Sequence, residues 1–428
     1  MDKLNSKTVL SVLLVILITT FLLRFIMLGQ AVYGDGIYYF AYTRSLVKDY
    51  DLHFENELEH RYGPDTNNTN KMLDPSEFLP DTPTNHVSNK YPVGPGLFWV
   101  PIFSIAEISA NIINLFYKDF PNNGYSNIYQ VTVGLFNVFA AFLGLVFLYK
   151  TLVHFFDKTI SILTIIATSL GTNLFYYTAL DVINSHPLSF LFGSIYFYIV
   201  FKKNISDKAL ILGFLSGILA LLRTQDIIFI FFTFVYIFFQ NLPYRNRLIN
   251  ILLSGSIFSV VFLIQMLSWK IIYGSYLALP YISGEEGFYF LTPHLLEVLF
   301  GLKVGLFIWT PFYLLSAVGL FMAFKKIPKI IPLFIIIQIY IISSWTGWSQ
   351  GESFGIRMII SILPLFCIGF AHLIQKLKLK YSVSLIALLI IFNFSAIFYF
   401  LVFSQNPTVD RGKNTQERVF EEINKLFR

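Results

Sequence analysis

The stretch TVLSVLLVILITTFLLRFIML, residues 8–28, decides the fold class, because about 20 mostly apolar residues suffice to cross the hydrocarbon core of a membrane. Lys3 and Lys7 precede it, as in a signal peptide, but no small-x-small cleavage site follows, so we expect a retained signal anchor. The whole chain agrees, since 55% of its 428 residues are hydrophobic and 13% are charged, where roughly a quarter are charged in soluble proteins. With 18% aromatic residues, this composition also excludes a disordered chain.

Ten further apolar stretches predict membrane spans. They lie at 127–149, 159–179, 185–201, 209–222, 226–240, 248–272, 305–324, 330–345, 357–374 and 381–403. One more apolar stretch, 93–116, follows Pro92, contains Pro95 and Pro101, and carries Glu107. We therefore expect it to be interfacial or re-entrant rather than to cross the membrane.

The Lys and Arg residues orient these spans through the positive-inside rule. With the N-terminus in the cytoplasm and 93–116 not crossing, the loops predicted to be cytoplasmic hold 15 of the 31 Lys and Arg residues but only three of the 25 acids. A crossing at 93–116 would invert every later loop. The sequence therefore predicts eleven spans, with the N-terminus inside and the C-terminus outside. The basic clusters are explained by membrane orientation, so nucleic-acid binding is not expected.

We thus expect an all-α polytopic protein of the cell (plasma or inner) membrane, forming a single transmembrane domain over 1–428. Its outer face would carry a large first loop with interfacial helices, 29–126, a second large loop, 273–304, and a short amphipathic tail, 404–428. One helix would lie on the membrane just after residue 37, where Tyr38, Tyr39 and Tyr42 are set against Thr43 and Arg44.

Several common active-site patterns are absent from the sequence. The single cysteine, Cys367, excludes an intrachain disulfide and a Cys-rich metal site. The seven histidines show no HxH or HExxH spacing, and there is no Gly-x-Ser-x-Gly elbow or Walker loop. Polar residues are sparse at span centres, where transporters place their substrates. The candidate functional residues lie instead at span ends on the predicted outer side.

Two of these candidates belong to the first outer loop. Asp35, in Tyr33-Gly34-Asp35-Gly36, follows the first span, and a charged group at this depth is often functional. Its structural alternative is an N-cap for the helix that follows. Lys90 precedes Tyr91 and Pro92, where a cation could hold a lipid phosphate. Its alternative is snorkelling to lipid head groups.

Other candidates come from later outer loops. Asp181 and His186 flank the start of the span at 185–201, and either could simply be a satisfied polar group at a helix end. Arg223 interrupts two apolar spans, where an ion pair with Asp226 is the alternative. Arg357 enters a span, which is costly unless it meets an anion. Four aromatic residues could line the same site, although packing at the membrane interface is the better explanation for each: Tyr38, Tyr39, Trp345 and Trp348.

The first span, Gly34-Asp35-Gly36, Tyr38-Tyr39 and the outer Lys90-Tyr91-Pro92 together resemble the C-type (GT-C) glycosyltransferase superfamily. The nearest branch is that of protein O-mannosyltransferases and aminoarabinose lipid A transferases (glycosyltransferase family 39). The resemblance implies an enzyme that takes a sugar from a polyprenyl phosphate on the outer face. It assigns catalysis to Asp35, phosphate binding to Lys90 and a second acid to Asp181. Gly36 departs from the Asp-Glu pair that is frequent in the family.

These residues suggest a mechanism. Phosphate is a good leaving group, so an inverting transfer needs a base for the acceptor hydroxyl and cations for the phosphate. We expect Asp35 as the general base, Lys90, Arg357 and Arg223 as phosphate ligands, and Asp181 to orient the sugar or acceptor. His186 and Tyr39 are further candidates for substrate binding.

The expected partners are the lipid-linked donor, membrane lipids, and a glycan, lipid or protein acceptor. No cofactor is expected, although a divalent cation could assist transiently. The rival functions are a transporter or lipid flippase, a non-catalytic partner in envelope assembly, and an O-antigen polymerase or ligase.

Overall fold

The computed structural model describes residues 5–60, 62, 82–202, 208–283, 286–351 and 353–404. Within these residues the fold is helical and has no β-strand, apart from one isolated antiparallel bridge between Phe288 and Trp345. The predicted all-α class is confirmed. Residues 405–428 of the predicted tail lie outside the described residues.

Six helices in the described ranges are long and apolar enough to cross a membrane, which is consistent with a helical membrane protein. They are α1 (Ser6–Leu28), α4 (Gly94–Phe116), α5 (Asn127–Leu152), α10 (Tyr244–Tyr273), α16 (Leu363–Gln375) with the turn before it (Arg357–Ile362), and α17 (Leu379–Tyr399) with its continuation to Val402.

Six more apolar helices are shorter than the width of a membrane core. They are α6 (Lys158–Leu170), α7 (His186–Phe201), α8 (Lys208–Leu222), α9 (Ile228–Phe238), α14 (Phe312–Met322) and α15 (Ile330–Ser344). Every predicted span is therefore helical, but some are broken. Pro311, for example, separates α14 from the single turn α13 (Leu306–Trp309).

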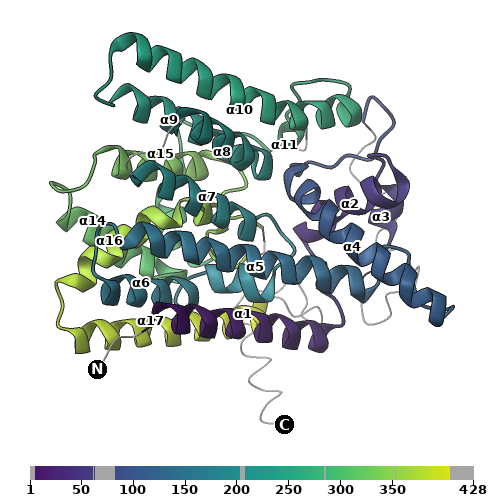
Figure 1. The fold of residues 1–428 in the computed structure, drawn as a ribbon, viewed down its shortest axis with the longest axis horizontal. Helices are drawn as coiled ribbons and strands as arrows, with labels where there is room; N and C mark the ends of the chain where they lie inside the picture. Colours follow the sequence, from purple (N-terminus) through teal and green to yellow (C-terminus); the bar gives the residue numbers. More distant parts are fainter. Residues whose placement is uncertain are drawn as a thin grey trace.

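The described residues of the segment predicted as the first outer loop, 29–126, form α2 (Asp35–Arg44), a π-helical turn (Ser45–Asp49), α3 (Glu55–Glu59) and α4. These helices gather at one end of the bundle (Figure 1). The helix expected after residue 37 is α2, and its side chains from Tyr39 to Arg44 are buried within the protein. Packing against α4 on one side and α3 on another encloses the helix.

Ion pairs explain how the charged end of α2 is buried. Arg44 Nη1 lies 2.5 Å from Glu57 Oε1 and 2.6 Å from Asp49 Oδ2. Lys48 Nζ lies 2.8 Å from Glu107 Oε1 on α4. Arg44, which was expected on the polar side of this helix, and Lys48 are therefore neutralised by acids of neighbouring segments, and these ion pairs tie α2, α3 and α4 together.

The stretch at 93–116 forms one unbroken helix, α4, with Pro101 in its interior. A re-entrant hairpin is therefore excluded for this segment. The helix packs against α2, α5 and α8, and in Figure 1 it lies with α2 and α3 towards the end of the bundle. Its length would suit a crossing as well as an interfacial position.

The second outer loop is held against the end of α15. It contains the short helices α11 (Pro280–Ser283) and α12 (Leu295–Phe300). Tyr289 N donates to Ser344 O at 2.6 Å, and Gly287 and Thr346 exchange hydrogen bonds of 2.9 Å. This attachment brings the loop to the side of the bundle where α2 begins.

Candidate functional site

A cavity of about 1050 Å³ lies where α2, the segment before α4, the 181–185 turn, the α8–α9 connection, the second outer loop and the start of the Arg357–Ile362 turn meet. Six of the seven predicted site residues line it: Asp35, Tyr39, Lys90, Asp181, Arg223 and Arg357. They come from five separate segments of the chain, so the fold brings together residues that are distant in the sequence.

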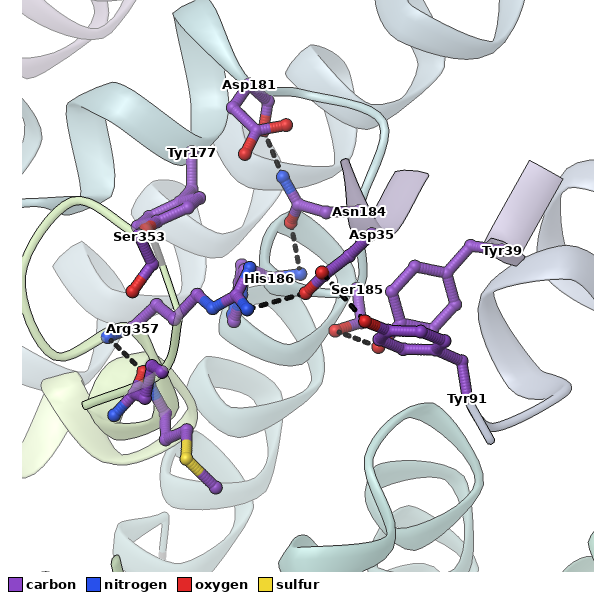
Figure 2. A network of polar contacts seen from close by, with 12 residues as sticks. Asp35, Tyr39, Tyr91, Tyr177, Asp181, Asn184, Ser185, His186, Ser353 and Arg357 are labelled. Atoms are coloured by element: carbon purple, nitrogen blue, oxygen red, sulfur yellow. Dashed lines mark hydrogen bonds and ion pairs between the residues drawn. The ribbon is translucent and has the colours of Figure 1, made fainter. Parts of the chain in front are cut away.

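Asp35 lies at the centre of the polar wall. Its Oδ2 is 2.6 Å from Arg357 Nη2, and its Oδ1 accepts a hydrogen bond of 2.8 Å from the Tyr91 hydroxyl (Figure 2). Asp35 is the first residue of α2 rather than its N-cap, which is Gly34, and no side chain caps this end. The N-cap alternative is therefore wrong, because the carboxylate binds across the cavity instead.

The glycines on either side explain how Asp35 reaches this position. Gly34 has a φ of 54°, a conformation that L-residues with a side chain rarely adopt. Gly36 packs against the backbone carbonyl of Ile183, and a Cβ there would collide with it. The contact brings the start of α2 against the turn that carries Asp181. A glutamate in place of Gly36 would not fit this contact.

Asp181 is held in the turn between a π-helical segment (Tyr176–Leu180) and α7. The Asn184 side chain donates to the Asp181 backbone carbonyl (Figure 2). Tyr33 Oη donates to Leu180 O at 2.5 Å. Burial raises the pKa of Asp181 to about 7, against the opposing charge of Arg357. Its carboxyl group therefore titrates near neutral pH while it faces the cavity.

Lys90 Nζ lies 2.6 Å from Glu286 Oε1, so it binds across the cavity instead of snorkelling. Sequence reasoning missed Glu286, which lies in the second outer loop and also lines the cavity. The signal that could have found it is the acidic pair Glu285-Glu286 between Gly284 and Gly287, in a loop already expected on the outer face. The other oxygen, Oε2, is buried and has no hydrogen-bond partner among the described residues.

The guanidinium group of Arg223 contacts the buried ring of His186. Arg223 Nη1 lies 2.9 Å from His186 Nδ1 and 3.4 Å from Ser185 Oγ, which also receives a 3.3 Å hydrogen bond from the Tyr39 hydroxyl. His186 is buried and is absent from the described lining of the cavity. Its contact is with Arg223, which does line the cavity. The suggested Arg223–Asp226 ion pair is not formed between these described residues, because Asp226 accepts from Ser361 instead.

A second part of the cavity wall is apolar. It follows Ile227 in the turn before α9, then α9 through Ile228, Phe231, Phe232 and Val235, and α15 through Ile330, Leu333, Phe334, Ile337 and Ile341. Phe231 and Leu333 are 59% and 51% exposed, so the apolar part opens sideways between the two helices. Of the four aromatic candidates, Tyr39 and Trp345 line the cavity, whereas Tyr38 stacks on Tyr91 and Trp348 on His294.

In the described part of the chain, no three His, Cys, Asp or Glu side chains are grouped so that they could hold a metal ion. The sequence matches no model of a known protein family, and no curated protein matches it. The geometry of the cavity is therefore the basis for a functional proposal.

Proposed function

We propose that this protein is a membrane glycosyltransferase that moves a sugar from a polyprenyl-phosphate-linked donor to an acceptor at the extracytoplasmic face. The observation that carries the proposal is the division of the cavity into two parts. Three cations and three carboxylates among the described residues line one end, and the apolar walls of α9 and α15 line the other. A ligand with an anionic head group and a long hydrocarbon tail has the matching chemistry.

The cations suit the phosphate of such a donor. Lys90, Arg223 and Arg357 enter the same cavity from different segments, and charged donors of this kind stabilise a departing phosphate. An arginine partly buried at a helix start is costly without an anion, and Arg357 meets that need through Asp35. A donor phosphate would replace Asp35 on Arg357, which would leave the carboxylate free to act as a base.

The proposed reaction is a single displacement. The acceptor oxygen attacks the anomeric carbon, the bond between that carbon and the phosphate oxygen breaks, and the phosphate leaves with the electron pair. Asp35 takes the proton of the acceptor hydroxyl, and the anomeric configuration inverts. Asp181 and Tyr39 orient the sugar or acceptor, while His186 acts through Arg223. Phosphate is already a good leaving group, so this reaction needs no organic cofactor.

The proposal includes the topology and superfamily expected from the sequence. Eleven spans with a cytoplasmic N-terminus would place the cavity at the outer face of the cell membrane, within reach of lipid-linked donors and envelope acceptors. The arrangement of an acid after the first span and a lysine before Pro92 supports membership of the GT-C superfamily.

The test is transfer by the Asp35→Asn variant. The purified protein in nanodiscs would be given a panel of polyprenyl-phosphate-linked sugars together with glycan, lipid and peptide acceptors, and release of polyprenyl phosphate would be measured. Loss of the base should lower the rate by at least about 100-fold, as is usual for general bases. Because Asn retains the shape of the side chain, binding of polyprenyl phosphate should persist.

The matched control is Asp119→Asn, which removes the same charge from an exposed position in the same outer loop. It should turn over at the wild-type rate. Wild-type turnover by Asp35→Asn would remove Asp35 from the mechanism, and failure of wild-type protein to release polyprenyl phosphate from any donor would remove the transferase assignment.

A second candidate function, lipid translocation, is favoured by one observation. A cavity of about 730 Å³ lies at the opposite ends of α9 and α15, beside Lys202 and Lys208, and it shares Phe232 and Ile330 with the first cavity. The two cavities thus adjoin along the same helices. Translocation needs no base, so Asp35→Asn would leave it intact while it abolishes transfer.

A further inference from the structure

In the Lys90–Glu286 ion pair, only one of the two carboxylate oxygens of Glu286 has a partner among the described residues. Glu286 Oε1 lies 2.6 Å from Lys90 Nζ, whereas Oε2 is buried without a hydrogen-bond partner in the described chain. Both side chains are about three-quarters buried, at 28% and 23% exposure. An incompletely satisfied carboxylate in such a place costs free energy, so a better ligand for Lys90 can replace it.

Lys90 is positioned by its neighbours rather than by Glu286. Asn89 Nδ2 donates to Tyr38 O at 2.9 Å, and the Tyr42 hydroxyl donates to Tyr91 O at 3.1 Å. The backbone on both sides of Lys90 is thus fixed to α2. The ammonium group would stay at the cavity if Glu286 moved away.

The backbone at Glu286 is fixed in the same way. Its N–H donates to Tyr281 O at 3.0 Å, and the next residue, Gly287, exchanges hydrogen bonds with Thr346. The loop therefore does not depend on the ion pair for its attachment. A rotation of the Glu286 side chain alone would break the pair.

We propose that Glu286 competes with the lipid phosphate for Lys90 and so limits how tightly the anionic head group is held. This inference rests on the proposed function and deepens it, because it assigns a role in binding and releasing the head group. A neutral head group cannot replace a carboxylate on an ammonium group, whereas a phosphate can. The competition therefore acts on anionic lipids and not on neutral ones of the same chain length.

The same competition helps the product to leave. The donor is a phosphodiester with one negative charge, and transfer converts it to a monoester with about −1.5 to −2 charge at pH 7. The product would bind three cations more tightly than the donor does. By returning to Lys90, Glu286 reduces the number of cations that hold the product.

The experiment measures dissociation constants for a polyprenyl phosphate and for the polyprenol of the same length, using purified full-length protein in nanodiscs. Glu286→Gln should bind the phosphate about tenfold more tightly than wild type does, because Lys90 loses its internal competitor. Binding of the polyprenol should not change. In turnover assays, kcat should fall while the affinity for the product rises.

One mutant background and one control variant show whether the effect acts through Lys90. In a Lys90→Met background, Glu286→Gln should give no further gain. Glu297→Gln removes the same charge from an exposed position in the same outer loop, and it should bind the phosphate as wild type does. Should Glu286→Gln not fold, Glu286→Asp, which withdraws the carboxylate by one methylene, should still bind more tightly than wild type.

Unchanged or weaker phosphate binding in both Glu286 variants would overturn this inference, and so would a gain that persists without Lys90. Either result leaves the transferase proposal standing if wild-type protein still releases polyprenyl phosphate from a donor. Binding of the phosphate lipid without any transfer would overturn the transferase proposal alone. Absence of phosphate binding in every variant would overturn both.

Discussion

At the residue scale, the position of Asp35 depends on the two glycines that flank it. Gly34 supplies a positive φ before α2, and Gly36 lets the backbone of Ile183 approach. The departure from the Asp-Glu pair of the resembling family thus has a steric reason here. A second carboxylate reaches the cavity from the neighbouring turn, as Asp181, instead of from the next position in the chain.

Asp181 makes a pH-dependent contribution that can be measured. Burial raises the pKa of its carboxyl group to about 7, so the group is protonated below pH 7 and ionised above it. Its proposed role is to accept hydrogen bonds from sugar or acceptor hydroxyls, which the carboxylate does better than the neutral acid. The transfer rate should therefore rise as the pH increases through about 7.

Asp181→Asn tests the origin of that rise. The variant should be slower at pH 8 and should lose the step near pH 7 in a plot of rate against pH. A step of the same size and midpoint in the variant would assign the titration to another group.

The sequence predicted the polar residues of the site better than their partners. Asp35, Lys90, Asp181 and Arg357 stand out because charges at the ends of apolar spans are expensive. Their pairing was not predictable, since Lys90 and Glu286 are 196 positions apart and no local pattern links them. The side chain of Glu286 was missed for the same reason.

At the element scale, the packing of α2 with α3 and α4 depends on the buried end of α2. Arg44 pairs with Glu57, whose side chain is fully buried, and its guanidinium also lies over the ring of Tyr125. The amphipathic pattern of this segment suggested a helix on a membrane surface. The pattern could not predict that α3 and the loop before α5 supply acids and aromatic rings for its charged end.

Arg44→Met should destabilise the protein by about 3–5 kcal/mol, because it leaves the Glu57 carboxylate buried without its counter-ion. Unfolding in detergent, followed by circular dichroism or tryptophan fluorescence, measures this. The matched control is Lys118→Met, at an exposed position after α4, which should change stability by no more than about 0.5 kcal/mol. Equal stability of the two variants would mean that the ion pairs do not hold α2 in place.

At the scale of the whole molecule, hydropathy and charge predicted the helical segments because each span is a local property of the sequence. Helix breaks were less predictable, as Pro311 and the turn at Arg223 illustrate. The orientation of the bundle depends on whether α4 crosses, and its length allows both arrangements.

Cysteine labelling tests the orientation directly. The single native cysteine, Cys367, is buried, so it should not react with a membrane-impermeant maleimide. Ser275→Cys, in the second outer loop, should be labelled in intact cells, whereas Lys326→Cys should be labelled only after permeabilisation. Both positions are exposed. The reverse pattern would mean that α4 crosses the membrane and that the predicted topology is inverted after it.

The sideways opening between α9 and α15, at Phe231 and Leu333, has a consequence for kinetics. A substrate that enters there comes from the surrounding bilayer and not from bulk water. Its effective concentration is then its mole fraction among the membrane lipids, so diluting the donor with other phospholipids should slow the reaction even when the total amount in the tube is constant. The lipid composition of the membrane would therefore determine the reaction rate at a given total amount of donor.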